Sequence, residues 1–93
     1  MRVLVVHDGV HRVTDGENGL RVSGHWWRPG KGHDTIRVHH AKGMPSAEGG
    51  RVVRYERTPE GRTLVVFAPD PAQAGRPWPA VGLLQGGFRT VEE

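Results

Sequence analysis

Hydrophobic positions along the chain fall into short runs, and turn-forming residues interrupt these runs at nearly regular intervals. The interruptions lie at Asp8-Gly9, 15–19, 29–32, 43–50, 59–61 and Gly86-Gly87. Short runs separated by Gly, Pro, Asn and Asp are typical of strands joined by tight turns. The pattern therefore predicts an all-β fold, a small barrel or a two-layer sandwich of about six to eight short antiparallel strands joined by hairpins.

Two central segments alternate between apolar and polar residues, which indicates strands buried on one face. In residues 20–27 the predicted inner face carries Leu20, Val22, Gly24 and Trp26, and the predicted outer face carries Arg21, Ser23, His25 and Trp27. Residues 34–40 alternate in the same way and place Arg37 and His39 on the outer face. We expect the two segments to form a hairpin with Trp26 opposite Ile36.

Turn sequences predict three further hairpins. Asp8-Gly9 favours a two-residue turn between strands 2–7 and 10–14, because this dipeptide readily adopts positive φ angles. Residues 58–61, Thr-Pro-Glu-Gly, suit a turn between strands 51–57 and 62–68, in a register that places Tyr55 beside Leu64. Residues 81–84 and 88–91 are expected to pair around Gly86-Gly87.

Two segments outside these hairpins are predicted to form a short helical turn and a connecting loop. Asp70 followed by Pro71 is a favourable start for one short helical turn at 71–75. The segment 43–50 is long for a hairpin connection, and we interpret it as a flexible connector.

Composition limits the classes of protein that the chain can belong to. Ninety-three residues predict one domain, residues 1–93, and the absence of cysteine excludes disulfides and zinc sites built on cysteine. The apolar start of the chain is too short for a signal peptide, and no stretch is long enough to span a membrane. We expect a cytoplasmic protein, in the host cytoplasm if a phage encodes it, or a virion component.

The charge balance is basic. The formal net charge is +3, and arginine supplies eleven of the thirteen cationic residues. A GC-rich genome, as in a bacteriophage or an actinobacterium, explains an arginine bias of this kind as well as phosphate binding does. The charge therefore does not select a partner by itself.

The best candidate surface is the predicted outer face of the central hairpin together with its basic loop. Its residues are Arg21, His25, Trp27, Arg28, Lys31, Arg37 and His39. Aromatic residues among cations can stack on bases and contact phosphates, and the same residue types dominate binding energy at protein interfaces. A third interpretation is that the segment around Trp78 covers Trp27 and makes it part of the core.

Metal binding and catalysis find little support. His25, His33 and His39 could converge, but only Asp34 lies near them in sequence, so we expect no metal site and no cofactor. The only serines are Ser23 and Ser46, and neither occurs in a nucleophile motif. We expect no catalytic residue and no enzymatic activity.

These observations predict a non-catalytic interaction module that binds another protein, such as a small phage-encoded or bacterial accessory factor or a minor component of an assembly. The alternative is a small β-barrel that binds nucleic acid through the Trp/Arg/His face and the basic loop. No membrane partner is expected. A homodimer formed through edge strands stays open.

Overall fold

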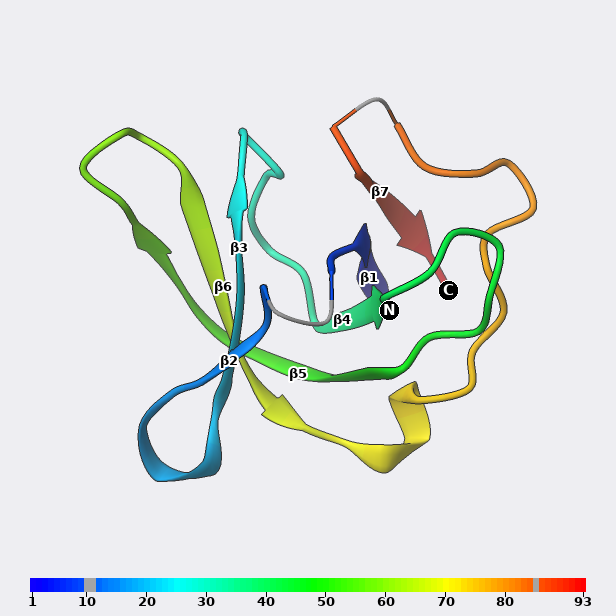
Figure 1. Cartoon of the computed structure of the whole chain (residues 1–93), viewed down its shortest axis with the longest axis horizontal. Coiled ribbons are helices and arrows are strands. Elements are labelled where there is room, and N and C mark those ends of the chain that lie inside the picture. Colours follow the sequence, from blue (N-terminus) through cyan, green and yellow to red (C-terminus); the bar gives the residue numbers. More distant parts are fainter. Residues whose placement is uncertain (10–11, 85) are drawn as a thin grey trace.

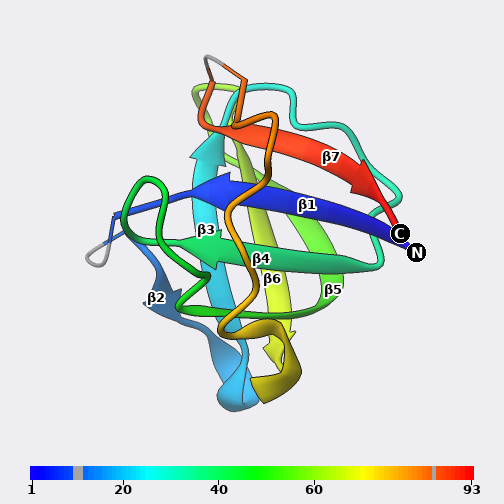
Figure 2. The ribbon, with the colours of Figure 1, turned by 90° about the vertical axis from the view of Figure 1, so that its right-hand side faces the viewer.

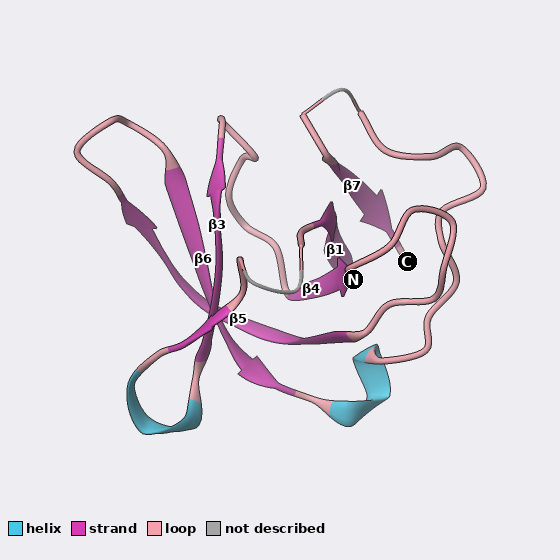
Figure 3. Ribbon diagram, in the orientation of Figure 1, coloured by secondary structure: helices cyan, strands magenta, loops and turns pink. Residues whose placement is uncertain are grey.

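A computed structural model gives the structure of the chain and describes residues 1–9, 12–84 and 86–93. The predicted all-β class is confirmed, because the described residues form seven strands and only two short 3-10 turns (Figures 1 and 3). The strands are β1 (Arg2–His7), β2 (Thr14–Asp15), β3 (Arg21–Trp26), β4 (Thr35–His39), β5 (Glu48–Arg57), β6 (Thr63–Pro69) and β7 (Phe88–Glu92). The 3-10 turns are η1 (Glu17–Gly19) and η2 (Pro71–Gln73).

The seven strands form one mixed sheet in the order β2-β3-β6-β5-β4-β1-β7. Neighbouring strands are antiparallel except β1 and β4, which are parallel, so the prediction of purely antiparallel pairing is wrong at this position. The terminal strands β2 and β7 do not pair with each other. The sheet is therefore sandwich-like and not a closed barrel.

β1 shows why the predicted first hairpin is wrong. Its two edges pair with β4 and β7, which leaves no edge for residues 10–14. Residues 14 and 15 pair with β3 instead, and residues 10 and 11 lie outside the described part of the chain. Val3 to Val6 are at most 2% exposed, as expected for a central strand covered on both faces.

The hairpin of β5 and β6 is confirmed, with a different register. Tyr55 lies opposite Val65 and not Leu64, and an irregularity in the pairing lies between Val52 and Arg54. Gly61 adopts a φ of +82° in the turn, as the Thr-Pro-Glu-Gly sequence predicts.

β5 bends and takes part in both layers of the sheet. Its first residues pair with β4 and its later residues pair with β6, so β1, β4 and β7 run across the direction of β3 and β6 (Figure 2). At Gly50 an added Cβ would lie 1.9 Å from the Ala68 carbonyl oxygen, so only glycine permits this close approach. The core between the layers consists of Leu4, Val6, Val13, Trp26, Ile36, Val38, Val65 and Phe67.

A segment without strands, residues 71–84, crosses the outer face of β1 and β4 (Figure 2). We call it the strap. It begins with the predicted helical turn, in which the Asp70 carboxylate accepts a hydrogen bond from the Ala72 amide. The turn fixes the preceding loop as well, since the buried Ser46 hydroxyl donates to the Gln73 carbonyl at 2.6 Å. Residues 46–50 are thus held in place, and Glu48 to Gly50 belong to β5, so the predicted flexible connector is wrong for this part.

The predicted last hairpin is correct only in part. β7 forms, but its strand partner is β1. Residues 81–84 are not a strand and approach β7 through two hydrogen bonds, from the Leu84 amide to the Phe88 carbonyl at 3.1 Å and from the Arg89 guanidinium to the Gly82 carbonyl at 2.8 Å. Residue 85 lies outside the described part of the chain.

Candidate functional site

The structure does not bring the seven predicted surface residues together. β3 pairs with β2 and β6, whereas β4 pairs with β1 and β5, so the predicted hairpin between these two segments is wrong. The residues of β3 and its loop separate from those of β4. They divide into an ion-pair network, a covered set and an exposed surface.

Arg21 belongs to the ion-pair network at the rim of the core. Its guanidinium donates to both carboxylate oxygens of Glu48, at 3.0 and 2.9 Å, and to Asp15 at 2.9 Å. The hydrogen bond from Arg21 lowers the pKa of Glu48. Arg21 thus links β3 to β2 and β5, and these bonds occupy its guanidinium group.

A bulge in β3 explains why its predicted faces hold for Trp26, His25 and Trp27 but not for Ser23, which is fully buried although the outer face was predicted for it. The pairing with β6 shifts between Gly24 and Trp26, which leaves His25 outside the regular ladder. Trp26 consequently lies on the inner side with Ser23, and its indole nitrogen donates to the Ser23 hydroxyl at 3.2 Å. Ser23 in turn donates to the buried Asp8 carboxylate at 2.9 Å.

Arg37 and His39 form the covered set beneath the strap. The Arg37 guanidinium donates to the Gln73 side chain at 2.8 Å and to both carboxylate oxygens of Glu93 at 2.5 and 2.7 Å. His39 is fully buried, packs edge-on against the Trp78 ring at 5.1 Å, and donates from Nδ1 to the Met44 carbonyl at 2.8 Å. Burial lowers the pKa of His39. Neither residue is available to a partner.

The structure keeps apart the three histidines that could have converged, His25, His33 and His39. His33 is held by Tyr55, whose hydroxyl accepts from the His33 amide at 3.0 Å and shares a second hydrogen bond with Nδ1 at 2.8 Å. Its Nε2 shares a hydrogen bond with the Thr90 hydroxyl at 2.9 Å, and burial lowers the pKa of His33. His25 is exposed and His39 is buried. Within the described residues, no group of three or more His, Asp or Glu side chains could hold a metal ion.

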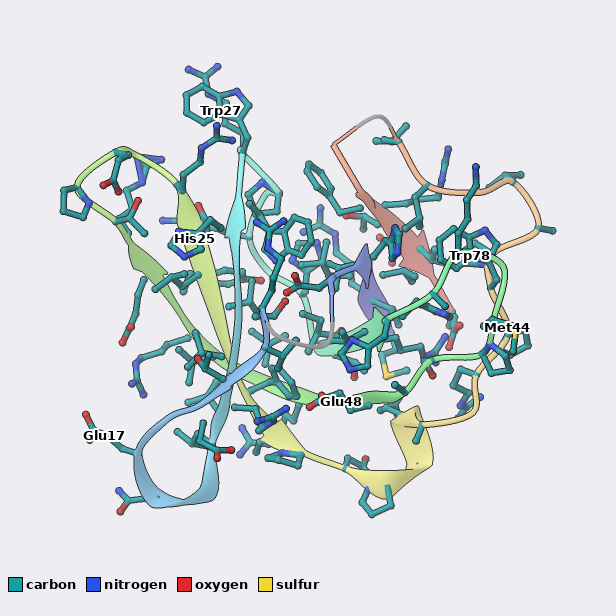
Figure 4. All side chains as sticks on the ribbon, in the orientation of Figure 1. Glu17, His25, Trp27, Met44, Glu48 and Trp78 are labelled. Atoms are coloured by element: carbon teal, nitrogen blue, oxygen red, sulfur yellow. The ribbon has the colours of Figure 1, made fainter. Side chains whose placement is uncertain are left out.

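Trp27 is the centre of the exposed surface. Its side chain is 51% exposed at the end of β3 (Figure 4). The guanidinium of Arg28 lies 5.3 Å from the ring centroid, and that of Arg62 lies 4.9 Å from it. Both distances are within the range of cation–π attraction, which holds the two charges beside the ring. The interpretation of Trp27 as a core residue beneath the Trp78 segment is therefore wrong.

Two shallow depressions adjoin this aromatic group. The first is lined by Arg12, His25, Glu60 and Arg62. The second is lined by Arg28, Pro29, Gly30, Lys31, Arg57 and Thr63. Because Arg62 and Arg28 both contact Trp27, the depressions and the indole form one continuous surface. We call it the Trp27 surface.

Charge is concentrated on the Trp27 surface. The two depressions are lined by five cations, those of Arg12, Arg28, Lys31, Arg57 and Arg62, and by one carboxylate, that of Glu60, which gives a formal charge of +4. Arg12 also forms an ion pair with the buried Asp8 carboxylate at 3.5 Å. The rest of the chain then holds eight cations and nine carboxylates, a formal charge of −1. A localised positive potential of this kind attracts anionic partners.

Sequence reasoning missed Arg12, Arg57 and Arg62. Arg62 reaches Trp27 because β6 neighbours β3, a pairing between distant segments that alternation does not reveal. A signal was nevertheless present for two of them. Arg57 and Arg62 flank one turn, and two like charges at the mouth of a hairpin require solvent or an anion around them.

The Trp27 surface has the chemistry of a binding site. Guanidinium groups can donate paired hydrogen bonds to phosphate or carboxylate oxygens, and the exposed indole can stack on a planar group.

Ser23 is fully buried and bonded to Asp8, and burial raises the pKa of Asp8. This pair is therefore closed to a substrate.

No protein-family model matches the chain, and neither a curated protein nor a solved structure does. In the part of the chain that the structure describes, no helix has the length and apolar character needed to cross a membrane. Arguments about function thus depend on the residues of the Trp27 surface.

Proposed function

We propose that this protein is a non-catalytic module that binds single-stranded nucleic acid through the Trp27 surface. One observation carries the proposal: a half-exposed tryptophan, with two guanidinium groups within cation–π distance of its ring, adjoins depressions lined by five cations and a single carboxylate. Unpaired bases offer planar faces for stacking, and the phosphates beside them offer oxyanions for arginine.

The arrangement suits single strands better than a duplex. In a duplex the bases are already stacked on one another, so an exposed indole has no base face to contact. The guanidinium groups of Arg28 and Arg62 lie within cation–π distance of the Trp27 ring, while Arg57 and Lys31 extend the positive charge along one depression. A strand that crosses Trp27 would therefore meet cations on both sides of the stacking group.

Another protein is the second candidate partner. Tryptophan and arginine, which form the centre of the Trp27 surface, are the residue types that most often dominate binding energy at protein interfaces. An acidic segment of a partner would satisfy the same cations. In either case the proposal places the protein as a small accessory factor, of phage or bacterial origin, in a cytoplasm or a virion.

Fluorescence anisotropy with a labelled oligothymidylate tests the proposal. If about four cations contact phosphates, the slope of log affinity against log salt is expected to be about −3. Arg57→Glu should weaken binding at least about tenfold and reduce the salt slope. The matched control is Arg51→Glu, which makes the same charge change at an exposed arginine on the other half of β5 and should change neither value.

Two results would decide against nucleic acid. One is the absence of binding at low salt. The other is an equal loss of affinity in Arg51→Glu and Arg57→Glu, which would indicate attraction to net charge only. A partner protein that is captured after nuclease treatment, and is lost with Trp27→Ala, would then support the second candidate.

A further inference from the structure

A second depression lies away from Trp27, beside Trp78 (Figure 4). It is formed where the strap passes the end of β1 and the turn before β7. His7, Lys42, Trp78, Leu83 and Leu84 supply its side chains, and its volume is about 380 Å³. That volume is within the range of sites for small organic ligands.

One wall of this depression is apolar and held in position. The Trp78 ring makes edge-on contacts with His7, at 5.8 Å between ring centroids, and with the buried His39, at 5.1 Å. Leu83 and Leu84 line the depression beside it, and Leu84 is 53% exposed. An apolar surface that is already ordered can accept a ligand with little further loss of conformational entropy.

The polar part of the lining is cationic. Lys42 contributes an ammonium group, and none of the lining side chains carries a carboxylate. Among the residues that the structure describes, no carboxylate oxygen lies within 4.0 Å of the Lys42 ammonium. The depression thus combines one available positive charge with an aromatic and aliphatic wall.

We propose that this depression binds a small apolar carboxylate. The apolar group of the ligand packs against Trp78 and the two leucines, and the carboxylate pairs with the Lys42 ammonium. Two sources share this chemistry: a free aryl or alkyl acid, and the C-terminal residue of a polypeptide with an apolar side chain. The site is separate from the Trp27 surface, so either proposal can fail without the other.

Titration with 3-phenylpropionate, followed by NMR of the indole N–H signals, tests the site. The Trp78 signal is expected to shift in a saturable way, with a dissociation constant of about 1 mM for a ligand of this size. The Trp27 signal should not move. The neutral isostere 3-phenyl-1-propanol should bind about tenfold more weakly, because it lacks the charge-assisted contact.

Two lysine variants provide a matched comparison, since the chain contains only Lys31 and Lys42. Lys42→Ala should weaken 3-phenylpropionate binding about tenfold, whereas Lys31→Ala should leave it unchanged. Both side chains are exposed, so neither change is expected to disturb folding. N-acetyl-Gly-Gly-Phe and its C-terminal amide distinguish the two sources, because tighter binding of the peptide acid indicates a chain terminus and tighter binding of 3-phenylpropionate indicates a free acid.

Three results would overturn the proposal. They are the absence of a saturable shift of Trp78 at about 20 mM ligand, equal affinities for the acid and the alcohol, and equal effects of the two lysine variants.

Discussion

Trp27 and Trp78 lie in separate regions of the molecule (Figure 4), and each has cationic or histidine side chains beside it. Trp78 is packed between His7 and His39, because the strap folds back over β1 and β4. Trp27 lies at the end of β3 with its side chain 51% exposed, and the guanidinium groups of Arg28 and Arg62 lie beside its ring. The same residue types therefore serve folding in one region and remain available for binding in the other. The difference comes from what covers each face of the sheet.

The largest expected effect is on the free energy of unfolding. It should distinguish Arg37 from Arg28, two residues that the sequence analysis assigned to one surface. Arg37→Glu removes the bonds to Gln73 and Glu93 and places a carboxylate beside Glu93, so we expect a loss of about 3 kcal/mol or more in the free energy of unfolding. Arg28→Glu on the Trp27 surface should change it by less than about 0.5 kcal/mol. Urea denaturation measures both, and equal losses would contradict the division into a covered and an exposed region.

Substitution of the covered tryptophan, Trp78, should also cost more stability than substitution of the exposed one, Trp27. Trp78→Ala removes the ring that covers His39 and is expected to cost about 2 kcal/mol of stability, somewhat less than a fully buried tryptophan. Trp27→Ala should cost less than about 1 kcal/mol and should weaken oligothymidylate binding by at least about fivefold. Urea denaturation and anisotropy on the same samples check the pair. A variant of Trp27 that unfolds would show that the indole supports the fold.

Stability should depend on pH through the covered histidines. Burial lowers the pKa of His33 and of His39 below 6.5, so in the window just below that value the unfolded chain binds more protons than the folded chain. Stability is then complete above about pH 6.5 and falls as the pH decreases, by at most about 1.4 kcal/mol per pH unit for each histidine. Urea denaturation between about pH 7.5 and 5 measures the slope.

Variants assign that slope to particular residues. His33→Gln and His39→Gln should each make the slope smaller, whereas His25→Gln, at an exposed position of the Trp27 surface, is expected to keep the slope of the unchanged protein. Burial raises the pKa of Asp8, so just above pH 3.8 the folded chain binds more protons at this carboxyl than the unfolded chain does. Asp8 therefore favours stability as the pH decreases, which is the opposite of the histidine effect. Because Asp8 is present in every variant, differences between the variants report the histidines. A slope that follows His25 would contradict the assignment.

The smallest expected effects test the independence of the two surfaces. Lys31→Glu should weaken oligothymidylate binding about fivefold and leave 3-phenylpropionate binding unchanged. Lys42→Glu should do the reverse. Anisotropy and NMR titration of each variant with both ligands check this, and a variant that alters both affinities would show that the regions are coupled or that net charge alone is responsible.

Local signals in the sequence were sufficient for some elements. The β5–β6 hairpin was predicted because Pro59 and Gly61 suit specific positions of one turn. The short turn η2 was predicted because Asp70 and Pro71 form a start signal for a helix. In both cases the residues that determine the structure lie within a few positions of one another.

Non-local pairing was not accessible in this way. The parallel contact between β1 and β4 joins residues more than thirty positions apart, as in Val3 with Thr35. Alternation correctly placed Ile36 and Val38 on the core face of β4, but it could not show that the strap covers the other face. A bulge at His25 puts both Ser23 and Trp26 on the inner side of β3, and no period-two pattern reveals an irregularity of one residue.

The central position of β1 has a consequence for the order of folding. The hairpin of β5 and β6 closes a short loop. The two partners of β1, which are β4 and β7, lie much further along the sequence from it. Closing a loop of this length costs more entropy than closing a hairpin, so the β1–β7 contact is expected to form late and to limit the rate. The amide of Glu93 donates to the carbonyl of Met1 at 2.7 Å, which places residues 1 and 93 side by side. A circular permutant that joins these two residues through a short linker, and is opened in the turn at 58–61, would turn the slowest contact into a local hairpin and the fastest hairpin into a distant contact.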